Sequence, residues 1–171
     1  QLIVAAGGKP AFKGYGQTPY PATLCISVND CVVHGIPNEK PFQNGDIIGL
    51  DIGMVYKGLY TDMARTVAIG IVTEQEKLLM TTAREALDLA LASIRPGITT
   101  GDIGYLIQSY VEKRNFGVVR DLAGHGVSHA LHESPEIPNF GKKGQGEKLT
   151  AGMVLAIEPM ITMGGWEVHV A

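Results

Sequence analysis

Four side chains in this sequence have the chemistry of metal ligands, and each interrupts an apolar or glycine-rich stretch. Asp51, Asp62 and Glu158 would supply carboxylates, and His125 would supply an imidazole. A carboxylate buried among apolar residues is costly unless it has a partner, and a cation removes that cost. Three oxygen ligands and one imidazole suit Mn²⁺, Fe²⁺, Co²⁺ or Zn²⁺ better than a thiolate site would. The sequence therefore indicates a divalent-metal site.

The two aspartates are expected to lie on one face of a β hairpin. Lys57-Gly58 separates two strand-like runs and is typical of a tight two-residue turn. This turn places Asp51 opposite Ala64, and Asp62 is two residues from Ala64. The acids would then be diagonal neighbours, roughly 7–8 Å apart at the backbone, and could share one or two cations as in two-metal hydrolases. The alternative is that one acid caps a loop while the other pairs with Arg65.

Two histidines could act as a metal ligand or as a catalytic group. Glycines flank His125, so the backbone can crowd a site while the imidazole reaches into it. His132 follows seven residues later and could polarise a carbonyl group or stabilise an oxyanion. His129 has no assigned role and is expected at the surface. His132-Glu133 lacks the second histidine of an H-E-x-x-H motif, which excludes a thermolysin-like zinc site. For His125 alone, a structural role is the alternative.

The elements that must position these residues alternate between hairpins and helices, which indicates an α+β fold. Periodic apolar residues predict one helix that begins at the capping box Thr73-x-x-Glu76 and stops at Pro96-Gly97. A second helix is capped by Thr99 or Thr100 and ends near Asn115. Strands are predicted at residues 24–28 and 31–34, which form a hairpin around Asn29-Asp30, and at residues 47–56, 59–69 and 153–160.

Composition limits the classes of function. The chain has 171 residues, of which 45% are hydrophobic and 18% charged, so a globular protein with a buried core is expected. The net charge is -3 and no long Lys or Arg run is present, which argues against nucleic-acid recognition. No segment has the length of a membrane span or the pattern of a signal peptide. Cys25 and Cys31 are expected to be reduced thiols of a cytosolic protein.

Several motifs resemble those of type I methionine aminopeptidases, in order and with similar spacing over nearly the whole chain. They are Cys25-Ile26-Ser27-Val28-Asn29, His34-Gly35-Ile36-Pro37, the Asp51 and Asp62 pair, Gly124-His125-Gly126, His132-Glu133-Ser134-Pro135, Pro138-Asn139-Phe140-Gly141 and Ile157-Glu158-Pro159-Met160.

The resemblance implies the pita-bread fold, in which two related αβ halves enclose a centre with two divalent ions (Co, Mn, Fe or Zn). Asp51 would bind one ion, Asp62 would bridge both, and His125 and Glu158 would hold the other. A water that bridges the ions would attack the scissile carbonyl, because metal coordination lowers the pKa of water towards about 7.

The resemblance also implies roles for residues around the substrate. His132 would contact the scissile carbonyl, and His34 would meet the substrate near the scissile nitrogen. The substrates would be peptides and nascent chains that begin with methionine, the ribosome is a further expected partner, and the protein would be a cytoplasmic monomer. The walls of the methionine pocket would be Tyr15, Tyr20, Cys25 and Trp166, with Phe12 and Leu131.

The sequence departs from the family pattern at two places. Ser128-His129 replaces the usual Gly-Arg, and the second bridging glutamate expected beyond Glu158 is absent; Glu167 and His169 do not match its motif. The chain is thus expected to be one catalytic domain, residues 1–171, truncated at both ends and weak in metal binding. A catalytically impaired or non-catalytic module that binds peptides or ribosomes is one alternative, and hydrolysis of X-Pro or creatine-like substrates is another.

Overall fold

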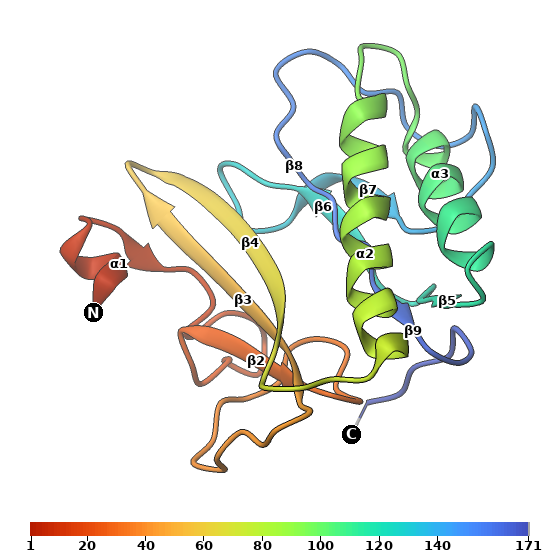
Figure 1. Cartoon of the computed structure of the whole chain (residues 1–171). Helices are drawn as coiled ribbons and strands as arrows, with labels where there is room; N and C mark the ends of the chain where they lie inside the picture. Colours follow the sequence, from red (N-terminus) through yellow and green to blue (C-terminus); the bar gives the residue numbers. More distant parts are fainter. Residues whose placement is uncertain (171) are drawn as a thin grey trace. The chain divides into compact units, whose positions relative to one another are not determined.

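The computed structural model describes residues 1–170, which form two compact units of mixed helix and strand. Unit 1 contains residues 1–76 and 127–132, and unit 2 contains residues 77–126 together with the residues after His132. Figure 1 shows the helices and strands of both units along the chain. The prediction of an α+β fold is confirmed.

The sheet of unit 1 is antiparallel and built around its third strand. One edge of β3 pairs with β4 along its full length, and the other edge pairs with β2 and then with the short β1. The helix α1 precedes this sheet. The elements are α1 (Leu2–Ala5), β1 (Lys9–Pro10), β2 (Leu24–Val28), β3 (Ile47–Tyr56) and β4 (Leu59–Ala68).

The β3–β4 hairpin turns at Lys57 and Gly58, as predicted. Both residues have positive φ angles, 50° and 84°, as a type I′ turn requires. The turn fixes the pairing of the whole hairpin, and Asp51 lies opposite Ala64. The predicted register is therefore correct.

The predicted hairpin around Asn29-Asp30 is wrong, because residues 31–34 do not form a strand. The side chain of Asn29 ties the end of β2 to the start of β3: its Oδ1 accepts from the backbone N–H of Ile47 at 2.9 Å, and its Nδ2 donates to Asp46 at 2.9 Å. β2 pairs with β3 on one side. On its other side the backbone N–H of Ile26 donates to the Gly35 carbonyl at 2.8 Å.

Two capping boxes begin the two long helices. The Oγ1 of Thr73 accepts from the backbone N–H of Glu76, whose carboxylate accepts from Thr73 in return. Thr99 and Asp102 repeat this arrangement at the next helix. The helices are α2 (Glu74–Ser93) and α3 (Thr100–Glu112), in agreement with the predicted spans.

The strands of unit 2 are short. Among the described residues of this unit, one sheet has the order β7-β6-β8 and the other pairs β5 with β9. The predicted strand over residues 153–160 is too long, because only Leu155–Ala156 pairs with β6 and Pro159 has no N–H to donate. The strands are β5 (Gly117–Val118), β6 (Ala123–Gly126), β7 (Glu133–Pro138), β8 (Leu155–Ala156) and β9 (Ile161–Thr162).

The core of unit 2 joins the two helices to the strands. Small residues of α2, Ala86 and Ala90, are fully buried against apolar side chains of α3 and of β7. Because α3 presents an isoleucine on successive turns, the stripe over Ile103 and Ile107 meets Ile137 of β7 in one cluster. Within residues 1–170, no helix combines the length and the apolar character needed to cross a membrane.

Candidate metal centre and substrate pocket

Asp51 and Asp62 lie on one face of the unit 1 sheet. Asp51 of β3 pairs with Ala64 of β4, and Asp62 of β4 pairs with Gly53. Because side chains alternate along a strand, Asp51, Gly53, Ala64 and Asp62 share a face, with the two acids diagonal to each other. Both aspartates are partly buried. The expected juxtaposition of the two acids is confirmed.

An apolar cluster covers the same face. Cys25 of β2 pairs with Asp51, so that its buried side chain lies beside the carboxylates. Phe12 packs over β3, since a Cβ on Gly53 would lie 2.4 Å from its ring. Four residues predicted to line the methionine pocket therefore lie in this cluster: Phe12, Tyr20, Cys25 and Leu131. The buried members of the cluster are Ala11, Phe12, Cys25 and Leu131, against which Tyr20, Val55 and Tyr60 pack.

The polar atoms of this cluster are held in their neutral forms. Burial raises the pKa of the Cys25 thiol, and the charges of Asp51 and Asp62 raise that pKa further, while a hydrogen bond with Tyr20 lowers it. Burial, followed by the contact with Cys25, raises the pKa of Tyr20. The Tyr20 hydroxyl donates to the Gly35 carbonyl at 2.8 Å. The cluster is therefore an uncharged surface next to two acids.

Sequence inspection did not single out Tyr60 and Val55, although a signal for them was present. The two residues pair across the β3–β4 hairpin. Each is an even number of positions from an acid on its own strand, so both lie on the face of Asp51 and Asp62. The register deduced from Lys57-Gly58 was sufficient to find them.

The candidate substrate-contacting histidines are exposed. Nδ1 of His132 lies 2.7 Å from the hydroxyl oxygen of Tyr15, and the two ring centroids are 5.2 Å apart. His34 has a φ of 58° and precedes Gly35, which is bound to β2 and to Tyr20. His129 is exposed, as expected. Unit 1 thus brings Tyr15 and His132 together.

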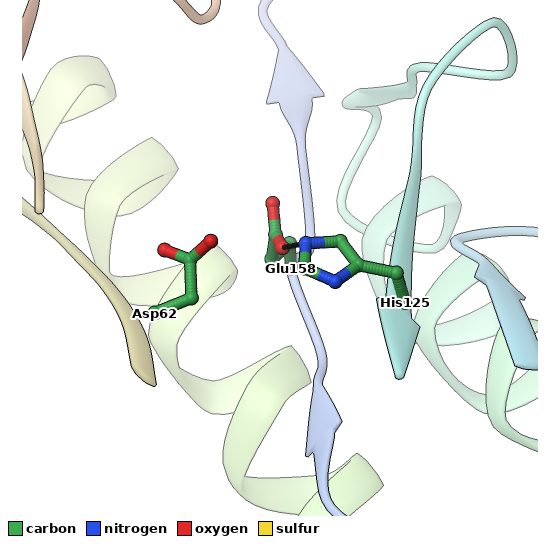
Figure 2. Close-up of side chains that lie close together, drawn as sticks. All are labelled: Asp62, His125 and Glu158. Carbon is green, nitrogen blue, oxygen red and sulfur yellow. Dashed lines mark ion pairs between the residues drawn. The ribbon is translucent and has the colours of Figure 1, made fainter. Parts of the chain in front are cut away.

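His125 and Glu158 lie side by side in unit 2. Figure 2 shows the side chains of His125, from β6, and Glu158, which follows β8, directed toward one another. His125 Nε2 lies 3.2 Å from Glu158 Oε1. Ala156 pairs with His125, and Glu158 follows two residues later. The Gly126 carbonyl lies 2.8 Å from His125 Nδ1 and can only accept, so Nδ1 carries the proton. In the neutral ring, Nε2 therefore has the lone pair that a metal ligand needs.

The glycines beside His125 are required by close backbone contacts. A Cβ on Gly124 would lie 2.3 Å from the carbonyl oxygen of Ala156, and a Cβ on Gly126 would lie 2.3 Å from that of Ser134. Neither backbone oxygen can move away cheaply. The two glycines thus let neighbouring backbone segments of the same unit approach both sides of the strand that carries the imidazole.

Trp166, a predicted pocket wall, belongs to unit 2. The guanidinium carbon of Arg120 lies 5.2 Å from the centre of its ring system, a cation–π distance, and also faces the ring of Phe140 at 5.7 Å. The same Arg120 reaches Glu112 at 3.7 Å. Trp166 is therefore positioned by a basic side chain of its own unit, and its contribution to a methionine pocket stays a prediction.

Comparisons with known proteins identify related sequences and structures. The chain matches the model of metallopeptidase family M24 over residues 4–171. The methionine aminopeptidase of Clostridium perfringens is 44% identical over 169 residues, which are 98% of this chain and 67% of that protein. The crystal structure of the methionine aminopeptidase from Thermotoga maritima is similar with a TM-score of 0.96 and 48% identity, over 99% of this chain and 68% of that one.

A prolidase is a more distant structural match. The enzyme from Pyrococcus furiosus has a TM-score of 0.70 and 26% identity, over 83% of this chain and 42% of that chain. The chain spans about two thirds of the length of the two methionine aminopeptidases above.

Proposed function

Since this chain belongs to metallopeptidase family M24, we propose that it is the metal-binding body of an aminopeptidase that removes methionine from the amino termini of peptides and nascent proteins. Its α+β architecture is the pita-bread fold of the methionine aminopeptidases and prolidases that it matches. One observation carries the proposal: Asp51 and Asp62 share a sheet face with the apolar cluster around Cys25.

The donors in each unit fit divalent ions. Unit 1 would contribute Asp51 and Asp62 as ligands, and unit 2 would contribute His125 and Glu158. The tautomer of His125 supports a metal ion at these side chains. Its Nδ1 donates to the Gly126 carbonyl, while its Nε2 points at the Glu158 carboxylate. Two acceptors at 3.2 Å repel one another unless a proton or a cation lies between them. When bound, divalent ions activate water and polarise a carbonyl group.

The apolar cluster supports methionine as the residue that is bound. Phe12, Cys25 and Leu131 are buried, and their surface is uncharged because the Tyr20 hydroxyl and the Cys25 thiol stay protonated. A thioether side chain is unbranched and polarizable, so it fills such a slot between aromatic rings and a sulfur atom well. Tyr15 and Trp166 would complete the walls.

Two histidines would act on the peptide itself. His132 would donate to the scissile carbonyl oxygen, and His34 would contact the substrate near the scissile nitrogen. Both side chains are exposed in the structure, so a peptide can reach them without displacing core residues. His132 follows the buried Leu131 of the apolar cluster, which keeps its backbone next to the proposed pocket.

The relatives favour methionine over proline-containing substrates. The similarity is much closer to methionine aminopeptidases than to prolidases, in both identity and TM-score. Nascent chains would be the cellular substrates, so the protein would act in the cytoplasm near ribosomes, and we propose that it does so as a monomer. Cell fractionation and gel filtration would test these assignments.

The proposal is tested by peptide hydrolysis. The purified chain is incubated with Met-Ala and Ala-Pro peptides, with Co²⁺ or Mn²⁺ and with EDTA. We expect metal-dependent release of methionine from the first peptide and no cleavage of the second. Cleavage of Ala-Pro alone would indicate a prolidase, and cleavage that survives EDTA would contradict a metal-dependent reaction.

A matched pair of variants tests the ligands. Asp62→Asn removes a proposed ligand, whereas Asp88→Asn makes the same change on an exposed turn of α2. We expect the first variant to lose methionine release and Co²⁺ binding measured by calorimetry, and the second to keep both. Equal binding by the two variants would remove Asp62 from the proposed centre.

A further inference from the structure

We propose that Tyr15 is a positioning residue that fixes the tautomer of His132, so that the neutral ring carries its proton on Nε2 and can donate it to a substrate carbonyl oxygen. The role given to His132 rests on the proposed function. The tautomer itself is a property of the free chain, and it follows from the contact between the two side chains.

The contact is short and joins distant parts of the chain. The Tyr15 hydroxyl oxygen lies 2.7 Å from His132 Nδ1, although 117 residues separate the two positions. A neutral imidazole has one N–H and one acceptor nitrogen, so a hydroxyl that donates to Nδ1 leaves the proton on Nε2. A phenol is a better donor than a neutral imidazole, and an imidazole nitrogen is a better acceptor than a phenol oxygen. The donor is therefore Tyr15.

Both rings are exposed, but their backbones are anchored to one buried cluster. The backbone N–H of Tyr15 donates to the carbonyl of Phe12 at 2.9 Å, and that of Tyr20 donates to the carbonyl of Tyr15 at 2.9 Å. His132 follows Leu131, which is 2% exposed and belongs to the same cluster as Phe12. The cluster thus holds the two polar groups at a fixed separation, which lowers the entropy cost of their hydrogen bond.

The partner of Nδ1 differs between the two candidate-site histidines. At His125 it is the Gly126 carbonyl, an obligate acceptor, so Nε2 keeps a lone pair as a metal ligand requires. At His132 it is the hydroxyl of Tyr15, which can donate, so Nε2 keeps a proton as a donor to an oxyanion requires. Each partner matches the task proposed for its ring.

The tautomer is measured directly by NMR. Metal-free chain labelled with ¹⁵N-histidine is examined at a pH where His132 is neutral, and long-range ¹H–¹⁵N correlations distinguish Nε2–H from Nδ1–H. We expect His132 to be the Nε2–H form in the wild type and a mixture of both forms in Tyr15→Phe, which lacks only the hydroxyl. Tyr56→Phe removes an equivalent exposed hydroxyl from the β3–β4 hairpin and should leave the His132 signals unchanged.

An Nδ1–H form in the wild type would overturn the proposal, and so would a His132 spectrum that Tyr15→Phe does not alter. Kinetics with a Met-Ala peptide and Co²⁺ provide a second test. Loss of one neutral hydrogen bond predicts a fall in kcat of about 2- to 10-fold in Tyr15→Phe with little change in KM, because the ring is retained. A raised KM with unchanged kcat would reduce Tyr15 to a pocket wall. If the wild type releases no methionine, the proposed function fails, and the NMR spectrum alone decides the tautomer.

Discussion

Substitution of Gly53 by alanine tests whether Phe12 packs on the face that carries the two aspartates. An ideal Cβ at this position would lie 2.4, 2.8 and 3.0 Å from three atoms of the Phe12 ring. Carbon atoms do not approach so closely, so the ring has to move. Phe12 is only 8% exposed and is packed among Cys25, Leu131 and Ala11, which leaves it little space for that movement.

Gly49→Ala is the matched control. Gly49 lies on the same strand and the same face, and a Cβ there would meet Ser27 at 3.6 Å, an ordinary contact. Both substitutions remove the same backbone freedom from the unfolded chain, a gain of about 0.4–1 kcal/mol in each case. That gain cancels in the comparison. The remaining difference is the overpacking cost at Gly53, about 1–3 kcal/mol.

The assay is urea denaturation of the wild type and of both variants, followed by circular dichroism. We expect the free energy of unfolding of Gly53→Ala to lie about 1–3 kcal/mol below that of Gly49→Ala. Phe12→Leu shortens the ring that obstructs the new methyl group, so the cost of Gly53→Ala should largely disappear in that background. Equal stability of the two alanine variants would refute the packing of Phe12 against Gly53. Strict additivity with Phe12→Leu would refute the direct contact.

Three other outcomes follow from the structure. Hydrogen bonds from the backbone N–H groups of Thr99 and Gly144 lower the pKa of Asp102. The stabilisation by this carboxylate is therefore complete above the ordinary aspartate pKa of about 3.9 and is lost as the pH falls through the lowered pKa. Denaturation at a series of pH values should show that the difference in unfolding free energy between the wild type and Asp102→Asn disappears in acid. Gly124→Ala forces a Cβ to 2.3 Å from the carbonyl oxygen of Ala156 and should lower the free energy of unfolding by about 1–3 kcal/mol and abolish methionine release, as denaturation and peptide assays would reveal. Removal of divalent metal with EDTA should lower the melting temperature, because a ligand whose free concentration is 100 times its Kd stabilises the folded chain by about 2.7 kcal/mol. Differential scanning calorimetry with and without Co²⁺ measures this change.

Local rules predicted the elements whose ends are encoded nearby. Lys57 and Gly58 adopt positive φ, and this dipeptide alone set the register that brings Asp51 and Asp62 together. The capping box at Thr73 and the capping threonine predicted at Thr99 or Thr100 likewise marked both helix starts, because a cap involves side chains only a few residues apart.

The errors arose where pairing is non-local. The β-branched run at residues 31–34 has strand propensity, but β2 finds its partner in β3, some twenty residues further along the chain. Propensity cannot select between two partners of similar composition, because cross-strand packing decides the pairing. The bond between Tyr15 and His132 could not be predicted for the same reason, since the buried residues of the apolar cluster that aligns them come from three separate segments.

Glycine has the same physical role beside candidate ligands in both units. Phe12 covers β3 at Gly53, two residues from Asp51, and backbone carbonyls approach Gly124 and Gly126 on either side of His125. At each place the missing Cβ lets a neighbour close over the strand, which should restrict the rotamers of the adjacent, partly buried polar side chain. A ligand that is already ordered loses less entropy when it binds an ion, so these glycines should govern metal affinity although they contact no metal. We therefore expect weaker Co²⁺ binding by a folded Gly53→Ala chain and normal binding by Gly49→Ala.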